Sequence, residues 1–174
     1  MIATVGAIVI SYVLGSVPTG LWLGLWLRKI DIREHGSKNI GATNTLRVLG
    51  QPLGALALAG DMAKGAIPVR LVAELSDWQY APIACGLAAI FGHTFSLFLK
   101  FRGGKGVATS AGVFAGLAPL PMIVAIVVFI AVFAATRMVS AGSILGAVAL
   151  AIAVFVFPTE TAVRVIALAV ALLV

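Results

Sequence analysis

FRGGKG (Phe101–Gly106) is a short, basic, glycine-rich turn between two apolar runs, Pro82–Leu99 and Ser110–Ala135. Each run is close to the length of about 20 apolar residues that a helix needs to cross a bilayer. The glycines let backbone N–H groups approach a ligand closely, and three cations between positions 100 and 105 add positive charge. The turn is therefore suited to an anion such as phosphate, unless it is an ordinary basic loop that only orients the chain in a membrane.

The composition of the whole chain is typical of a membrane protein. Of its 174 residues, 61% are hydrophobic and 10% are charged, whereas a soluble domain is about half apolar and a quarter charged. Water cannot solvate that much apolar surface, so we expect an all-α, polytopic integral membrane protein. No linker is evident, and we expect one membrane-embedded domain over residues 1–174.

Six apolar segments indicate where the chain enters the membrane. They are Ile2–Leu27, Leu53–Leu75, Pro82–Leu99, Ser110–Ala135, Ile144–Phe157 and Thr161–Val174. With a short helix around Ile40–Gly50, they predict about seven transmembrane helices. The first segment lacks a basic start and a small-residue cleavage site, so we interpret it as a retained span and not as a signal peptide. Pro119 and Pro121 leave open whether the fourth segment crosses the membrane or goes partway and returns.

Polar features interrupt these apolar segments. GSVPTG (Gly15–Gly20) either kinks the first segment and leaves carbonyls free, or forms a small-residue packing face. Asp61 and Lys64 are three residues apart, so on a helix they share a face and can pair in a polar cavity, unless they extend to the interface. Cys85 is the only cysteine, so it cannot form an intramolecular disulfide, and we interpret it as a packing residue.

The net charge of +6 does not indicate binding to nucleic acid, because the cations lie in short segments between the spans. In the longest such segment, Arg28–Arg47, Lys and Arg outnumber the acidic residues. The positive-inside rule explains this distribution and predicts that these loops face the cytoplasm. Glu74–Tyr80, which is acidic and aromatic, is expected on the opposite side.

Three polar stretches share one composition: GSKNIGATNTLR (Gly36–Arg47), FGHTFSLFLKFRGGKG (Phe91–Gly106) and TRMVSAGS (Thr136–Ser143). Each contains Gly, hydroxyl residues and Arg or Lys with few carboxylates, which favours an anion as ligand. Two histidines and no HExxH or CxxC motif predict no metal site. The P-loop motif GxxxxGK[ST] is absent, because position 99 is leucine and position 106 is glycine. His93, inside an apolar segment, is either a packing hydrogen-bonder or an acid or base.

GSKNIGATNTLR, GDMAKG (Gly60–Gly65) and GHTFSLFLKFRGGKGVAT (Gly92–Thr109) together resemble the acyl-phosphate:glycerol-3-phosphate acyltransferase family of bacterial membranes. The similarity spans residues 14–145. It implies a multi-pass enzyme of the cytoplasmic (inner) membrane with its active site on the cytoplasmic face. It would transfer a fatty acyl group from acyl-phosphate to the 1-hydroxyl of sn-glycerol 3-phosphate, which gives lysophosphatidic acid and phosphate in phospholipid biosynthesis. We expect a monomer with no cofactor, whose partners are these substrates and membrane lipid.

The resemblance also implies the site residues. The implied catalytic residues are Ser37, Arg47, His93 and Lys105, and the implied substrate- or phosphate-binding residues are Asn39, Thr43, Asn44, Lys64, Gly103, Gly104, Gly106, Ser140 and Ser143. The general base is left open between His93 and the phosphate of the donor. The chain departs from the family pattern at Lys38, where glycine is expected, and at Ser96, where proline is expected. We also expect a polar tail of the form HRxNIxRL after the last helix, and the sequence stops before one.

A membrane transporter of phosphate or an organophosphate is the alternative, since it would also gather cations and glycines near membrane depth. A transporter should show internal repeats and access from both faces. No repeat is evident, and the cationic segments all fall on one predicted side of the membrane. An acyl-CoA-type mechanism is disfavoured, because the HxxxxD signature would need aspartate at position 98, which is phenylalanine.

Overall fold

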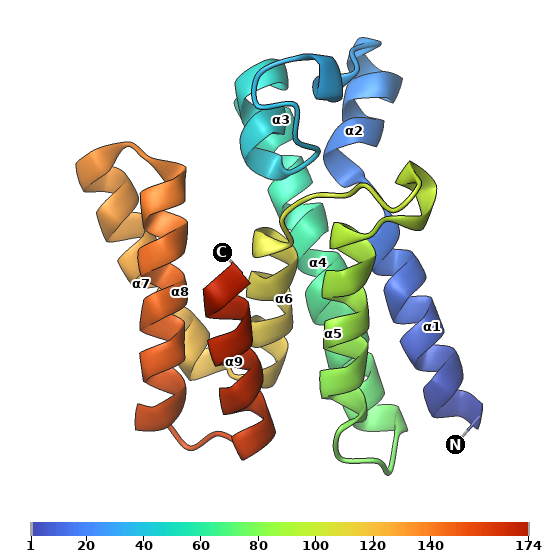
Figure 1. Cartoon of the computed structure of the whole chain (residues 1–174), viewed down its shortest axis with the longest axis vertical. Helices are drawn as coiled ribbons and strands as arrows, with labels where there is room; N and C mark the ends of the chain where they lie inside the picture. Colours follow the sequence, from blue (N-terminus) through green and yellow to red (C-terminus); the bar gives the residue numbers. More distant parts are fainter. Residues whose placement is uncertain (1, 174) are drawn as a thin grey trace. The chain divides into compact units, whose positions relative to one another are not determined.

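The computed structural model of the protein describes residues 2–173, and within them the chain is helical, with connecting turns and loops and no β-strand. The α-helices in this part of the chain are α1 (Ile2–Ser16), α2 (Thr19–Leu23), α3 (Ala42–Leu49), α4 (Gln51–Leu75), α5 (Ala81–Thr94), α6 (Val107–Leu117), α7 (Pro119–Thr136), α8 (Val139–Val156) and α9 (Thr161–Leu173) (Figure 1). A π-helical turn, η1 (Gly24–Arg28), and two 3₁₀ turns, η2 (Ile32–Glu34) and η3 (Leu97–Leu99), complete the helical elements. The all-α prediction is confirmed.

The chain divides into two compact units, of which the N-terminal one runs to Val113 and the C-terminal one begins at Phe114, inside α6. The division does not test the expectation of one membrane domain over residues 1–174, which stays a prediction.

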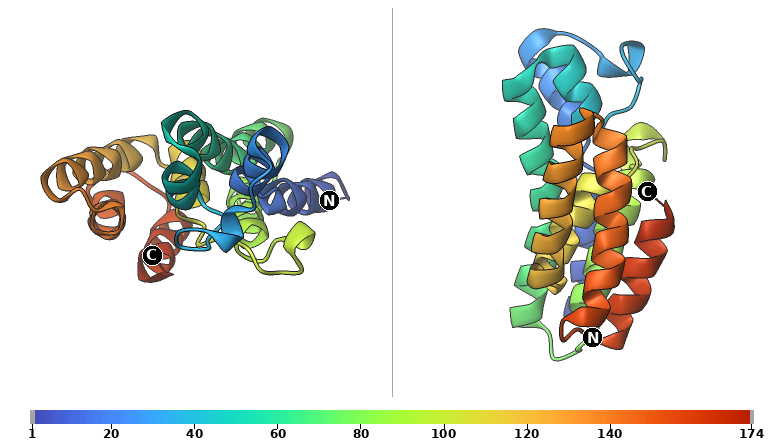
Figure 2. Two further views of the ribbon diagram at one scale, coloured as in Figure 1. Left: turned by 90° about the horizontal axis from the view of Figure 1, so that it is seen from above. Right: turned by 90° about the vertical axis from the view of Figure 1, so that its left-hand side faces the viewer.

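In the N-terminal unit, α1, α4 and α5 pack side by side (Figures 1 and 2). The contact between α1 and α5 is made by small residues. A Cβ atom on Gly15 would overlap with the carbonyl oxygen of Ala89, and one on Gly92 with the carbonyl oxygen of Tyr12. The two backbones therefore approach as closely as small-residue interfaces allow in membrane helices. The packing role predicted for GSVPTG is confirmed at its first glycine.

The first apolar segment is also kinked, as the other interpretation of GSVPTG predicts. The helix axis bends by 47° between residues 3–16 and 19–28. Val17 and Pro18 lie at the bend, where proline cannot supply the N–H that would continue the helix. The two interpretations were not exclusive, because one glycine packs while the proline breaks the helix.

Several helices have the length and composition of membrane spans. They are Ala81–Leu99, which joins α5 to η3, then Pro119–Thr136 and Val139–Val156, with the bent first segment as a fourth candidate. Val107–Leu117 and Thr161–Leu172 are shorter apolar helices. Helix α4 has 25 residues but carries four charged side chains, among them Asp61 and Lys64.

Two sequence expectations are refined by these bounds. The short helix expected around Ile40–Gly50 is α3, but its eight residues extend over about 12 Å and cannot cross a hydrocarbon core of about 30 Å. The segment Ser110–Ala135 is not one helix, because α6 ends at Leu117 and Ala118 leaves helical geometry with φ −145° and ψ 70°. The break directly precedes Pro119, where the sequence left an interruption open.

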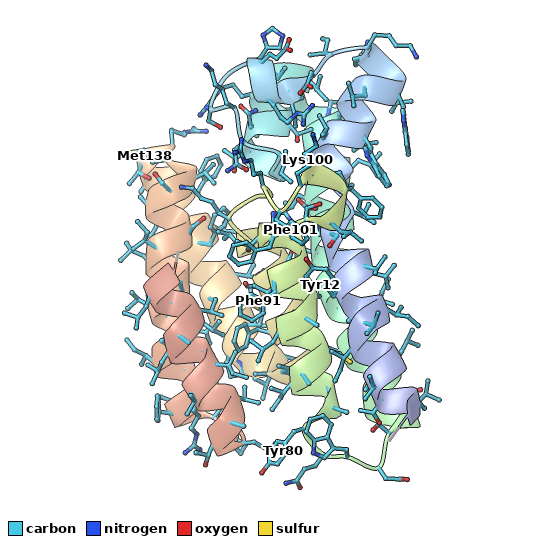
Figure 3. All side chains as sticks on the ribbon, turned by 45° about the vertical axis from the view of Figure 1, so that its right-hand side comes forward. Tyr12, Tyr80, Phe91, Lys100, Phe101 and Met138 are labelled. Carbon is cyan, nitrogen blue, oxygen red and sulfur yellow. The ribbon has the colours of Figure 1, made fainter. Side chains whose placement is uncertain are left out.

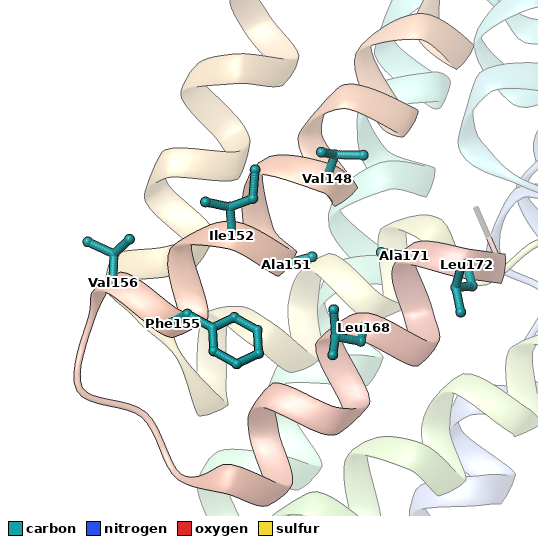
Figure 4. Close-up of a pocket in the computed structure, with 8 residues that line it drawn as sticks. All are labelled: Val148, Ala151, Ile152, Phe155, Val156, Leu168, Ala171 and Leu172. Carbon is teal, nitrogen blue, oxygen red and sulfur yellow. The ribbon is translucent and has the colours of Figure 1, made fainter.

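In the C-terminal unit, α8 packs against both α7 and α9. An open groove of about 720 Å³ lies between α8 and α9 (Figure 4). Its lining consists of Val148, Ala151, Ile152, Phe155, Val156, Leu168, Ala171 and Leu172. All of these side chains are apolar, so the groove suits hydrocarbon and offers no group for an anion.

Candidate anion-binding site

The basic loops of the N-terminal unit lie at one end of it. The connection between η1 and α3 (residues 29–41) and the connection between α5 and α6 (residues 95–106) are both at the upper end in Figure 1, and the turn between α4 and α5 is at the lower end. Figure 3 shows the same separation, with Lys100 and Phe101 far from Tyr80. The cationic loops therefore share one end, and the acidic, aromatic turn occupies the other.

All three glycines of the FRGGKG turn are required by its geometry. A Cβ atom on Gly103 would overlap with the carbonyl oxygen of His93, and one on Gly104 with Nε2 of the same residue. Gly106 has a φ of 75°, which side-chain-bearing residues rarely adopt. The N–H groups of Gly103 and Gly104 donate to the carbonyls of Thr94 and His93 at 2.9 and 3.0 Å. These two amides hold the loop together, so amides that remain for a ligand must come from elsewhere.

The N-terminus of α6 supplies such amides. The helix begins at Val107, directly after the turn, and Ser110 donates its N–H to the carbonyl of Gly106 at 2.7 Å. The N–H groups of the residues before Ser110 have no acceptor within their own helix. They point towards the turn with the positive end of the helix dipole, which is the arrangement that binds anions.

The cations of the turn remain available. All three cations, Lys100, Arg102 and Lys105, are exposed. None of them forms a salt bridge within residues 2–173. Lys100 and Phe101 have φ values of 52° and 62°, a left-handed geometry that costs about 1 kcal/mol or more per residue. The turn is held in this shape by the N–H of Phe101, which donates to the carbonyl of Ser96 at 2.8 Å.

A buried polar cluster lies against the turn. Asp61, Lys64 and His93 are exposed by only 1%, 8% and 4%. Lys64 Nζ lies 2.8 Å from Asp61 Oδ1 and donates to the carbonyl of Val17 at 2.7 Å, while His93 Nδ1 lies 3.8 Å from Asp61 Oδ1. The predicted pairing of Asp61 with Lys64 is confirmed, and the pair lies inside the unit instead of extending to an interface. The ammonium group of Lys64 is thus already occupied by protein acceptors.

The kink after α1 is bonded to both neighbouring elements. Of its freed carbonyls, that of Val17 accepts from Lys64, and that of Ser16 accepts from the hydroxyl of Ser96 at 2.6 Å. Ser96 is buried with a φ of −64°, the value that proline requires. The departure from the family pattern at this position therefore keeps a backbone compatible with proline and adds a hydrogen bond.

Asn44 organises the other basic loop. Its side chain is 1% exposed, and its Nδ2 donates to the carbonyls of Ile32 and Asn39, both at 2.8 Å. Its Oδ1 accepts from the N–H of Ser37 at 2.8 Å. The amide is fully engaged by the loop, so its contribution to a site is to shape residues 32–41.

The remaining polar residues of this loop differ in exposure. Ser37, Thr43 and Arg47 are exposed, and Asn39 is half-buried with its Oδ1 accepting from the N–H of Gly41 at 2.9 Å. Lys38 has a φ of 59°, which explains why glycine fits this position in the family pattern.

Asp31 and Arg33 form an exposed ion pair in the same loop, with Nη2 2.6 Å from Oδ2. The side-chain hydrogen bonds from Arg33 lower the pKa of Asp31. The charge of Arg33 is therefore neutralised by Asp31, whereas Arg47 forms no salt bridge within residues 2–173.

An apolar cluster connects the two basic loops. Ile32 and Ile40 of the first loop are buried with Leu21, and Leu99, which precedes the glycine turn, packs against them. The predicted residues of the two blocks are thus held at one end of the N-terminal unit. Ser140 and Ser143 lie in the first turns of α8, in the C-terminal unit, and their part in the site stays a prediction.

Comparison with known proteins finds relatives over most of the chain. The sequence model of a family described as glycerol-3-phosphate acyltransferase matches residues 5–174. A glycerol-3-phosphate acyltransferase of Trichlorobacter lovleyi is 49% identical over 148 residues, which are 85% of this chain and 76% of the relative. One of Streptococcus pyogenes is 44% identical over 151 residues, 87% of this chain and 71% of the relative.

Two solved structures are also similar to the chain. They are crystal structures of PlsY, an integral membrane glycerol 3-phosphate acyltransferase, in a glycerol 3-phosphate form and a lysophosphatidic acid form. Their TM-scores are 0.92 and 0.90 at 31% sequence identity, and the matches cover 98% of this chain and 86% and 85% of those chains.

Proposed function

Because the chain belongs to the glycerol-3-phosphate acyltransferase family, we propose that it transfers a fatty acyl group from acyl-phosphate to the 1-hydroxyl of sn-glycerol 3-phosphate. The products are 1-acyl-sn-glycerol 3-phosphate and inorganic phosphate, and the reaction serves phospholipid biosynthesis. The observation that carries the proposal is the exposed basic turn with its three glycines, followed at once by the free amides of α6. Both substrates carry a phosphate that such a site recognises.

The exposed cations divide the binding work in this proposal. Arg47 and Lys105 bind the substrate phosphates. Within residues 2–173, neither the guanidinium group of Arg47 nor the ammonium group of Lys105 forms a salt bridge. Ser37 and Thr43, whose side chains are exposed in the same loop as Arg47, add hydroxyl donors. Gly103, Gly104 and Gly106 give the turn its shape, and Asn39 and Asn44 shape the first loop.

The chemistry needs no covalent enzyme intermediate, since acyl-phosphate is already activated. The 1-hydroxyl oxygen attacks the acyl carbonyl carbon, the new ester bond forms, and the bond from the acyl carbon to the phosphate oxygen breaks. Phosphate leaves and takes the proton of the hydroxyl, so the donor itself serves as base. Fixed positive charge and oriented N–H groups stabilise the negative charge that develops in the transition state. His93 is disfavoured as the base because its ring is 4% exposed and its Nε2 faces Gly104.

The proposal places the protein in the cytoplasmic (inner) membrane of a bacterium, as a monomer surrounded by lipid. The positive-inside rule supports a cytoplasmic position for the end that carries both basic loops.

The test is phosphate release by the purified protein in lipid, given palmitoyl-phosphate with and without glycerol 3-phosphate. We expect release that requires glycerol 3-phosphate and falls at least about 100-fold in Lys105→Ala, because one charged contact to a phosphate is lost in the transition state. Arg28→Ala is the matched control, since it removes an exposed cation that lies outside the glycine turn, at the end of η1. Release that is independent of glycerol 3-phosphate, or equal in Lys105→Ala and the control, would contradict the proposal.

A further inference from the structure

Asp61, Lys64 and His93 are retained inside the N-terminal unit at a cost. Each side chain is more than nine-tenths buried, and within the described residues Asp61 Oδ2 and His93 Nδ1 have no hydrogen-bond partner. Desolvating a charged pair offsets much or all of its attraction, so an apolar pair of similar volume is often as stable or more stable. Ionisable groups at membrane depth generally serve a function instead. Stability alone therefore does not account for this cluster.

The cluster forms a packed path from the kink to α5, in which the last step is not a hydrogen bond. Lys64 of α4 donates to the carbonyl of Val17 in the kink at 2.7 Å and contacts Asp61 at 2.8 Å. Asp61 Oδ1 lies 3.8 Å from His93 Nδ1 on α5, beyond hydrogen-bond distance, so the ring packs beside the carboxylate without bonding to it. The path joins the kink after α1 to α4 and α5 through three side chains.

His93 extends the path to the glycine turn in two ways. Its carbonyl accepts the N–H of Gly104 at 3.0 Å, and its Nε2 occupies the space that a Cβ atom on Gly104 would need. The turn therefore rests on the backbone and on the ring of His93, so a shift of the ring would move Gly104 and Lys105.

We propose that Lys64, Asp61 and His93 are positioning residues that hold the glycine turn at a fixed place relative to the kink. They set where Lys105 and the first amides of α6 meet the phosphate of glycerol 3-phosphate, and His93 acts through the turn, without receiving a proton from substrate. The inference rests on the proposed function for the identity of this ligand. It assigns the cluster to substrate binding and so predicts changes in KM with little change in kcat.

The first experiment compares Asp61→Asn, Lys64→Met and the double variant in lipid. Each single variant leaves an unpaired buried group, so we expect both to unfold at a lower temperature than the double variant. The double variant should raise the KM for glycerol 3-phosphate about tenfold and keep kcat within about threefold, because a displaced turn weakens binding. A double variant with the KM of the wild type would show that the cluster only stabilises the fold. A loss of kcat at unchanged KM would assign it to proton transfer, and either result overturns the inference.

The second experiment leaves the charges in place. Gly104→Ala adds a methyl group against the ring of His93 and should raise the KM about tenfold, whereas His93→Ala/Gly104→Ala should recover part of that loss because space is made. Gly6→Ala is the matched control, since a Cβ atom there meets nothing within 4 Å. The fold-increase in KM is also measured for His93→Ala alone. A fold-increase in the double variant equal to the product of the fold-increases in the two single variants would overturn the inference, even if the charge variants do not fold.

A binding measurement separates failure of this inference from failure of the proposed function. Glycerol 3-phosphate should raise the unfolding temperature of the wild-type protein, because a ligand that binds the folded state stabilises it. A wild type that neither turns over nor responds contradicts the proposed function. A wild type that responds, with Gly104→Ala responding at the same ligand concentration, contradicts only the positioning role.

Discussion

At the scale of single residues, the structure separates side chains that face solution from those that shape the loops. Ser37, Arg47 and Lys105 are exposed, whereas Asn44 and His93 are buried. Both groups belong to the same polar blocks of the sequence, and composition does not distinguish them. The distinction matters for mutagenesis. Replacing an exposed cation removes a contact to the ligand, whereas replacing a buried amide disturbs the shape of the loop.

Asn44→Asp isolates the role of a buried amide. The change keeps an oxygen for the N–H of Ser37, but it places a second oxygen against the carbonyls of Ile32 and Asn39. We expect the free energy of unfolding to fall by about 2–3 kcal/mol, since three carbonyl acceptors, the third being that of His35, lose their donor. Thermal unfolding in lipid or detergent measures this loss.

Asn39→Asp is the matched control for that stability measurement. Its Oδ1 accepts from the N–H of Gly41, and an aspartate retains this acceptor. Its unfolding temperature should stay close to that of the wild type. An equal loss in the two variants would mean that Asn44 is no more important to the loop than the half-buried Asn39.

At the scale of elements, the kink after α1 is the feature that joins helices distant in the sequence. A proline break leaves carbonyls without their helical donors, and in lipid such groups must find partners within the protein. Ser96 and Lys64 supply those partners from the α5–α6 connection and from α4. The kink is therefore bonded to its neighbouring elements and is not a region of loose structure.

Ser96→Ala tests this bonding. The variant leaves the carbonyl of Ser16 without its donor in a buried position, so we expect a loss of about 1–3 kcal/mol in the free energy of unfolding. Ser76→Ala is the control, because its hydroxyl makes a 3.3 Å contact with Thr4 at the C-terminal end of α4, away from the kink. The unfolding temperatures of the two variants are compared, and that of Ser96→Ala should be the lower. Equal values would show that the carbonyl of Ser16 needs no donor.

At the scale of the whole molecule, the charges indicate an orientation in the membrane. The loops that contain Lys38 and Lys105 lie at one end of the N-terminal unit, and the turn with Asp77 and Trp78 lies at the other. Positive loops are retained on the cytoplasmic side during insertion. This orientation would give the basic end access to the water-soluble glycerol 3-phosphate of the cytoplasm.

Cysteine labelling tests the orientation in intact bacterial cells. In a Cys85→Ala background, Gln79→Cys should react with a membrane-impermeant thiol reagent added outside, because Gln79 is exposed in the turn opposite the basic loops. Lys38→Cys should react only after the cells are made permeable. The reverse pattern would contradict the proposed cytoplasmic site.

Features that depend on neighbouring residues could be inferred from the sequence. Its apolar content required a helical membrane protein, Pro18 predicted the kink, and the glycines of residues 101–106 predicted a tight basic turn before a helix. The spacing of Asp61 and Lys64 predicted their pairing. Local sterics and the cost of bare backbone in lipid decide such features, so they can be inferred from short stretches of sequence.

The groups that meet across long stretches of sequence became visible in the folded chain alone. Ser96 bonds to a carbonyl 80 residues away, and Lys64 to one 47 residues away. The engagement of Asn44 by its own loop, and the use of the amides of Gly103 and Gly104 to hold the turn, were likewise invisible in the pattern. A freed carbonyl accepts from any donor that packing brings near it, so sequence predicts the need for a partner while the fold selects the partner.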